Sequence, residues 1–149
     1  MLCSQLPLNA TTIVEAAYWP DYIRQFGFRV FAPWHFIDIP IVRLDGADPS
    51  TVHPEPPPTV NNVLWAVELG AAALKDPSTS LAVKSAALRF VLHFVGDIHQ
   101  PLHTASLFSP RFPNGDGGGN AFRVRGSSDW HNLHGTACVH ECSCGYVGI

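Results

Sequence analysis

The 149-residue sequence predicts an all-α fold, a helical bundle, because two long segments show helical spacing and strand patterns are almost absent. Between residues 60 and 74, apolar residues recur every three or four positions, which is the spacing of one helix face. Residues 81–98 are apolar around most of the helix circumference, so we expect this helix at the centre of the bundle. Only residues 122–124 indicate a short strand.

An N-terminal helix is predicted ahead of these two. Thr12 and Glu15 fit a capping box, which satisfies the backbone N–H groups of a first helical turn. Pro20 is expected to stop or kink this helix after residue 19, because proline lacks the N–H that a helix interior needs. A second helical turn is then expected over residues 21–26, and Gly27 closes it.

Most of the remaining segments are predicted to be loops and turns, and one segment is left without an assignment. Residues 33–38 are rich in aromatic side chains and show no clear period. The five prolines of residues 49–58 exclude a regular hydrogen-bonded ladder. Residues 76–80 predict a turn that also supplies N-cap oxygens to the next helix. A glycine-containing loop is expected over residues 106–120.

Composition and charge narrow the class of protein. A chain of 149 residues suits one domain, and 46% hydrophobic content with 14% charged residues indicates a globular protein. The formal net charge of -3 offers no basic surface for gripping a nucleic-acid backbone. A phosphate-containing substrate would therefore have to be held by metal ions and a few local groups. No stretch is long and apolar enough for a membrane span, and the N-terminus lacks the pattern of a signal peptide.

The strongest functional signal is the run of residues 88–103, which places three histidines and one carboxylate among apolar residues. His93 and Asp97 are four positions apart and share one helix face. Pro101 ends the helix, which lets His103 return toward that face from a turn. Neutral imidazoles with a bridging carboxylate suit zinc, and a buried aspartate needs such a partner. A buried hydrogen-bonded pair of His93 and Asp97 is the alternative.

This run resembles the signature of the S1/P1 nuclease family, zinc enzymes that cleave single-stranded nucleic acid and 3'-nucleotides. The insertion over residues 107–116, ahead of Gly118-Gly119-Asn120, is similar to the 3'-nucleotidase/nuclease branch found in trypanosomatid-like protists. The resemblance extends from about residue 17 to residue 134 and implies an all-α bundle of the phospholipase C/P1 nuclease type.

The resemblance also implies that this bundle is incomplete. We expect the chain to be truncated at both ends, with a partial P1 nuclease-like domain over residues 1–134. Residues 135–149 have no helix or strand period and a high cysteine density, so they are interpreted as an unassigned tail from an aberrant reading frame.

By resemblance, one zinc site of the family is complete in this chain. Asp21 matches the first ligand, His35 the second, His93 the third and Asp97 the fourth, which bridges to other metals. Two imidazoles and two carboxylates form a sensible zinc set. Taken singly, Asp21 would be interpreted as a helix cap, and His35 as a hydrogen-bonded core histidine.

The other two zinc ions of the family are expected to lack ligands here. His103 and His134 match the histidines of the second site, but Cys138 stands where the family has a carboxylate. The third site needs an N-terminal tryptophan and a nearby histidine, and only Asp97 remains of its ligands. His99 is expected to cap the helix or to orient a ligand. The resemblance thus implies three zinc ions in the family and one complete site in this chain.

Further residues match family positions that act on the substrate. Asp21 would orient or deprotonate the attacking water, and Arg24 matches an arginine that faces the phosphate. Phe36 and Asp38 match residues that stack on and hydrogen-bond a nucleobase, and Asn120 matches an asparagine that helps to hold the substrate. Core packing is the alternative for Phe36, and a solvated helix face is the alternative for Arg24.

The predicted function is a zinc-dependent hydrolase of ester bonds, an endonuclease on single-stranded DNA or RNA and a 3'-nucleotidase. Its activity is expected to be impaired, because two of the three zinc sites lack ligands. The alternatives are a non-catalytic zinc-binding fragment and a phospholipase C-like phosphodiesterase; the segments 35–38 and 118–120 favour the nuclease. The substrate is the partner that the resemblance implies, with no protein partner, and family members are secreted or held at the cell surface.

Overall fold

The computed structural model describes residues 12–125 and 130–132, which belong to two compact units. The first unit contains residues 12–37 and 58–100, and the second contains residues 38–57, 101–125 and 130–132. The elements of the first unit are α1 (Ile13–Gln25), the 3-10 helix η1 (Arg29–His35), α2 (Val63–Lys75) and α3 (Leu81–His99). Those of the second are β1 (Ile39–Val42), the 3-10 helix η2 (Pro49–Thr51), α4 (Pro101–Thr104), β2 (Ala105–Phe108), β3 (Arg123–Arg125) and β4 (Trp130–Asn132).

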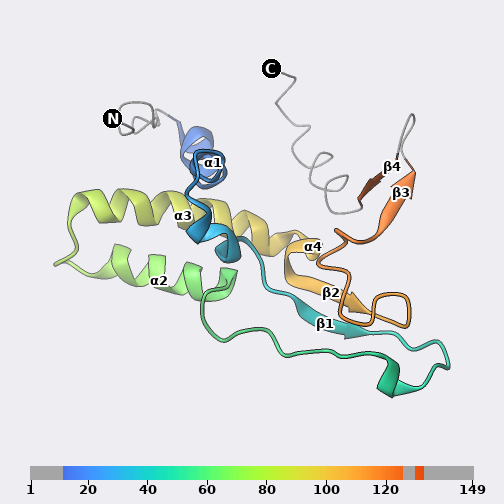
Figure 1. Cartoon of the computed structure of the whole chain (residues 1–149). Helices are drawn as coiled ribbons and strands as arrows, with labels where there is room; N and C mark the ends of the chain where they lie inside the picture. Colours follow the sequence, from blue (N-terminus) through green and yellow to red (C-terminus); the bar gives the residue numbers. More distant parts are fainter. Residues whose placement is uncertain (1–11, 126–129, 133–149) are drawn as a thin grey trace. The chain divides into compact units, whose positions relative to one another are not determined.

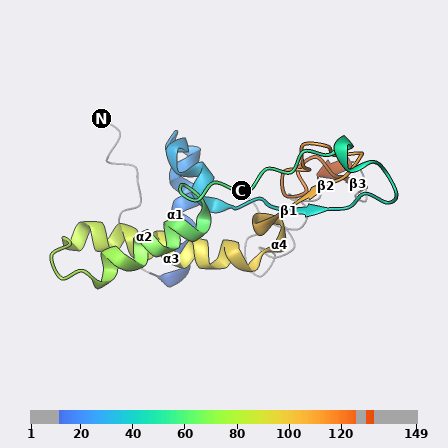
Figure 2. The ribbon, with the colours of Figure 1, turned by 90° about the horizontal axis from the view of Figure 1, so that it is seen from below.

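Helices α2 and α3 lie side by side in the first unit, as both views show (Figures 1 and 2). The Asn62 side chain accepts the N–H of Trp65 at 3.0 Å and starts α2. The Ser80 side chain accepts the N–H of Val83 at 3.4 Å and starts α3. The two predicted helices and the N-cap role of the turn between them are therefore confirmed.

A glycine lets these two helices approach closely. Gly70 is buried in α2, and a Cβ added there would lie 2.6 Å from Cγ2 of Val91 in α3. Real Cβ atoms do not approach a neighbour that closely, so the Val91 methyl occupies the space that a side chain at position 70 would fill.

The core of the first unit lies between α2, α3 and η1. Phe94 of α3 and Val63 of α2 are 0% exposed. The buried cluster comprises Ile37, Val63, Ala66 and Phe94, and partly buried Trp34, Trp65, Val67, Phe90 and Ile98 pack against it. Helix α3 contacts α1, α2 and η1, as its central position requires. Its apolar residues nevertheless do not all face the core: Leu81 is 83% exposed and Leu88 is 47% exposed.

Helix α1 begins at the predicted capping box, but it does not stop at Pro20. Thr12 Oγ1 accepts the N–H of Glu15 at 3.2 Å, and the Glu15 carboxylate accepts the N–H of Thr12 at 3.1 Å. The helix then continues through Pro20, so of the two predicted outcomes the stop after residue 19 is wrong. A proline removes only one backbone hydrogen bond, and Pro20 is one of the most completely buried side chains of the described chain. Its burial offsets that loss.

The end of α1 follows the glycine prediction. Gly27 has φ +94°, a left-handed conformation that glycine adopts without a Cβ clash. The N–H of Gly27 binds the carbonyl of Arg24 at 3.2 Å, and the N–H of Phe28 binds the carbonyl of Ile23 at 3.3 Å. This pair of bonds is a Schellman motif, which closes the helix and turns the chain toward η1.

The second unit contains short strands. β1 and β2 pair in parallel, with Ile39 opposite Ala105, so the prediction of a loop throughout 106–120 is wrong for its first residues. β2 has only four residues and pairs with a segment far away in the sequence, and neither property leaves a local pattern. β3 pairs antiparallel with β4 and confirms the short strand predicted near residues 122–124.

The all-α prediction is confirmed, since helices dominate and the strands of the described residues form only two-stranded sheets. Pro101 is the first residue of α4, so the predicted end of the long helix before it is confirmed. No helix within the described ranges has the length and apolar character that crossing a bilayer requires. The predicted tail of residues 135–149 lies outside the described residues, and the division at residue 134 stays a prediction.

Candidate metal centre

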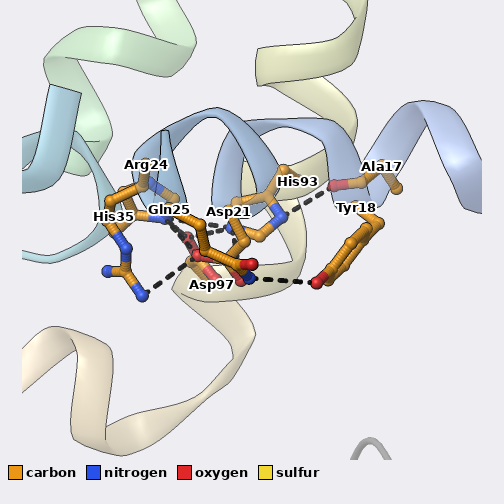
Figure 3. Close-up of polar contacts among 8 residues, drawn as sticks. All are labelled: Ala17, Tyr18, Asp21, Arg24, Gln25, His35, His93 and Asp97. Carbon is orange, nitrogen blue, oxygen red and sulfur yellow. Dashed lines mark hydrogen bonds and ion pairs between the residues drawn. The ribbon is translucent and has the colours of Figure 1, made fainter. Parts of the chain in front are cut away.

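Three elements of the first unit bring four polar side chains together (Figure 3). Asp21 comes from α1, His35 from the last residue of η1, and His93 and Asp97 from α3. The last two lie one above the other because residues four apart share a helix face. Sequence reasoning predicted this group. The structure brings the four side chains together, and their role as metal ligands stays a prediction.

The distances within the group suit a divalent cation. His35 Nδ1 lies 3.0 Å from His93 Nε2 and 3.1 Å from Asp97 Oδ2, and the last two atoms are 3.3 Å apart. Asp21 is farther away, with its oxygens 4.0 Å from His35 Nδ1 and 3.8 Å from His93 Nε2. Ligand atoms around a tetrahedral zinc lie about 3.3–3.4 Å from one another. The observed spacings bracket that value.

The His93 side chain is already oriented to bind a metal ion. Its Nδ1 lies 2.7 Å from the backbone carbonyl of Ala17, and only a protonated nitrogen can donate there. Nε2 therefore carries the lone pair and points at His35 and Asp97 (Figure 3). Burial lowers the pKa of His93, and the nearby carboxylates of Asp97 and Asp21 only partly counteract it. The neutral imidazole is the form that binds a metal.

The donor set fits a metal better than it fits a proton. A proton on His35 Nδ1 is directed either toward Asp97 Oδ2 or toward His93 Nε2. The other acceptor then receives no well-directed hydrogen bond. A divalent cation at their centre satisfies all three atoms at once. Zinc favours this mixture of imidazole nitrogen and carboxylate oxygen. The described residues thus contain a group that can hold a metal ion.

Burial shows where the group is open. The side chain of His35 is 4% exposed, those of His93 and Asp97 are each 13% exposed, and that of Asp21 is 34% exposed. The group is therefore most accessible to solvent beside Asp21. The imidazoles are backed by Phe94, whose ring centroid lies 5.0 Å from that of His35 and 5.7 Å from that of His93.

Arg24 lies at the open side of the group. Its Nη2 is 3.3 Å from Asp21 Oδ1, and its side chain is 49% exposed. Helical spacing alone places the two residues together, since they are three positions apart on α1. The guanidinium thus lies beside the Asp21 carboxylate with about half of the side chain exposed, and the phosphate-facing role of Arg24 stays a prediction. In the same part of α1, Gln25 donates to the Tyr18 hydroxyl at 3.1 Å.

The other predicted site residues lie outside this group or outside the description. Phe36 follows His35 directly and is 40% exposed, which argues against core packing as its role. Asp38, His103 and Asn120 belong to the second unit, and their site roles stay predictions. His134 and Cys138 lie outside the described residues.

His99 does not join the four-residue group. Its Nδ1 lies 2.6 Å from the carbonyl of Val95, four residues earlier in α3, which agrees with the expected capping role near the helix end.

The supporting partners of the group were not foreseen from the sequence. The hydrogen bond from His93 uses the main-chain carbonyl of Ala17, and a main-chain acceptor leaves no trace in residue identity. Phe94 was noted only as an apolar neighbour of His93. The signals available in the sequence were that Phe94 directly follows His93 and that its side chain is aromatic.

Comparison with known proteins agrees with this geometry. The family model described as S1/P1 Nuclease matches residues 2–137. The chain is 31% identical over 136 residues to Endonuclease 4 of Arabidopsis thaliana, covering 87% of this chain and 43% of that protein. It is 28% identical over 140 residues to Nuclease S1 of Aspergillus oryzae, covering 85% of this chain and 40% of that protein. The chain thus spans less than half the length of these two curated relatives.

Proposed function

Because the chain belongs to the S1/P1 nuclease family, we propose that it is a zinc-dependent phosphoesterase that hydrolyses single-stranded DNA or RNA and acts on 3'-nucleotides. The observation that carries the proposal is the convergence of His35, His93 and Asp97 within 3.3 Å of one another, with Asp21 on the open side. Zinc bound there supplies Lewis-acid activation of water and of phosphoryl oxygens near neutral pH.

The chain's own residues have separate proposed roles in binding and catalysis. His35, His93 and Asp97 hold the ion, and the Ala17 carbonyl fixes the His93 tautomer. Asp21 is the most exposed member and orients the attacking water at the opening. The Arg24 guanidinium, half-exposed beside it, offsets negative charge that develops on the phosphoryl oxygens.

The proposal extends to residues outside the four-residue group. Phe36 and Asp38 are proposed to receive the nucleobase, Asn120 to hold the substrate, and His103 and His134 to bind a second zinc. Stacking on Phe36 would tolerate any base, since every base has a π face. We also propose that activity is reduced relative to family members with three zinc sites, and that the protein acts in secreted or cell-surface form.

Zinc stoichiometry and hydrolysis test the proposal together. Purified chain loaded with zinc would be analysed for bound metal by mass spectrometry and assayed on single-stranded DNA and on 3'-AMP, with and without chelator. Asp97→Asn preserves the shape of the side chain but loses the ligand charge, so zinc affinity should fall at least about 100-fold, together with hydrolysis. His99→Ala, on the same helix but outside the group, is the matched control and should retain both.

Several outcomes would contradict the proposal. Tight zinc binding without hydrolysis of either substrate would favour a non-catalytic zinc-binding fragment. Hydrolysis of phosphatidylcholine without effect on nucleotides would favour a phospholipase C-like enzyme. Three tightly bound zinc ions per chain would show that the expected ligand count is wrong.

A further inference from the structure

A hollow with two arginines lies in the first unit next to the metal centre. It has a volume of about 380 Å³ and is lined by Arg24, Gln25, Arg29 and Ala32. Arg24 and Gln25 are in the last turn of α1, and Arg29 and Ala32 are in the first turns of η1. The Schellman motif at Gly27 reverses the chain between these two elements. As a result, both arginines line the same hollow.

The charge of this hollow stands out against the rest of the chain. The sequence has only nine Lys and Arg residues and a formal net charge of -3, so two arginines on one small surface are a local excess. Among the described residues, Arg24 pairs with the Asp21 carboxylate at 3.3 Å, and Arg29 has no ion-pair partner. Other arginines are engaged elsewhere: Arg43 pairs with Asp45, and Arg89 lies over the ring of Trp19.

The hollow and the metal centre share a residue. Arg24 contacts Asp21 of the metal group and also lines the hollow. A ligand bound in the hollow would therefore lie next to the open side of the metal centre. The size of the hollow falls at the lower end of the range for small-molecule sites, about 300–1,000 Å³. That is room for one nucleotide unit of a strand whose neighbouring phosphate would lie at the metal centre.

We propose that Arg29, together with Arg24, binds a second phosphate of a single-stranded polynucleotide, next to the phosphate at the metal centre. The chemistry favours this ligand, because a guanidinium offers a planar set of donors to phosphate oxygens. A 3'-mononucleotide has no second phosphate in this position. Arg29 therefore sets a preference for polynucleotide over mononucleotide, a specificity that rests on the proposed function.

Binding measured without cleavage tests the role of Arg29 directly. A fluorescein-labelled 12-nucleotide oligothymidylate would be titrated with the full chain in EDTA, by fluorescence anisotropy at several salt concentrations. Circular dichroism would confirm that EDTA leaves the helix content intact. Arg29→Gln should bind about tenfold more weakly at low salt, and the slope of log affinity against log salt should fall by about 0.7, the value of one single-strand phosphate contact.

Two further variants make the readout specific. Arg29→Lys keeps the charge and should recover most of the salt slope while losing part of the affinity. Lys84→Ala is the charge-matched control: Lys84 lies nine residues before His93 on α3, about 14 Å along the helix. It should leave the affinity and the slope unchanged. In the zinc-loaded protein, Arg29→Gln should lower the ratio of kcat/KM for oligonucleotide to kcat/KM for 3'-AMP by about tenfold.

The outcomes separate this inference from the function on which it rests. If the wild-type chain binds the strand but neither binds zinc nor hydrolyses the strand, the proposed function fails. In that case a reduced salt slope in Arg29→Gln would still support the phosphate site. If hydrolysis occurs but Arg29→Gln and Lys84→Ala give the same slope and the same substrate ratio, the role of Arg29 is overturned.

Discussion

Replacing Phe94 tests whether the core and the metal centre depend on one another. The Phe94 ring is 0% exposed and stacks on Phe90 with centroids 5.4 Å apart. It also meets the rings of His35 and His93 nearly at right angles, at 5.0 and 5.7 Å. One side chain therefore fills the core and holds two imidazoles in orientation.

The expected magnitude follows from these contacts. Truncating a fully buried phenylalanine to alanine removes its transfer free energy and leaves a cavity, so Phe94→Ala should lower the free energy of unfolding by about 3–5 kcal/mol. Phe94→Leu leaves a smaller gap and should cost about 1–2 kcal/mol, which keeps the chain folded if the larger truncation unfolds it. Both variants should weaken zinc binding by about 10–100-fold, the usual effect of losing support behind a ligand.

Urea unfolding in EDTA and zinc titration of the folded variants measure the two effects separately. Leu88→Ala is the control on the same helix, because Leu88 is 47% exposed and its truncation should cost less than about 1 kcal/mol. A loss of stability in Phe94→Leu with unchanged zinc affinity would refute the claim that the ring orients His35 and His93. A change in stability no larger than that of the control would refute the packing itself.

Two other predictions follow from the same unit. Gly70→Ala should destabilise the protein, because the new Cβ lies 2.6 Å from Cγ2 of Val91 and overpacking of about 1–3 kcal/mol exceeds the roughly 1 kcal/mol gained in helix propensity. Combining it with Val91→Ala should abolish that extra cost, and purely additive urea midpoints would contradict the contact. The second concerns pH: burial lowers the pKa of His93, so below about pH 6.5 the unfolded chain binds a proton that the folded one does not. The free energy of unfolding of zinc-free protein should fall between pH 7.5 and 5.5, and less steeply in His93→Gln; equal slopes would count against a buried neutral imidazole.

Local patterns predicted the helices of the first unit well, because their causes are local. The spacing of apolar residues over 60–74 predicted α2 itself, although Leu64, one of those residues, is 45% exposed. The pair His93 and Asp97 was predicted to share a face, since helical geometry fixes that relation once the helix is known. The joining of Asp21 and His35 to that pair came from family resemblance, and no property of either segment alone requires it.

The features that sequence reasoning missed are those whose causes are distant or main-chain. Strand β2 forms because residues 105–108 meet residues 39–42, and neither segment carries an alternating pattern. The continuation of α1 through Pro20 depends on the burial of that ring, which outweighs one missing hydrogen bond. The anchoring of His93 depends on the carbonyl of Ala17, which any residue at that position would offer.

The position of His93 implies that a metal ion bound at this centre would be coupled to folding of the first unit. Its side chain joins three elements: it shares α3 with Asp97, donates to the main chain of α1 at Ala17, and faces His35 of η1. Without a cation, the two carboxylates and two imidazoles of the centre are held by hydrogen bonds and by the packing behind them. A zinc ion that binds only the folded arrangement adds its binding free energy to stability, about 4 kcal/mol at 1,000 times its dissociation constant. Because α1 and η1 meet α3 at this centre, the added stability would fall on these contacts. Zinc-free protein should therefore lose the packing of α1 and η1 on α3 before it loses the pairing of α2 with α3.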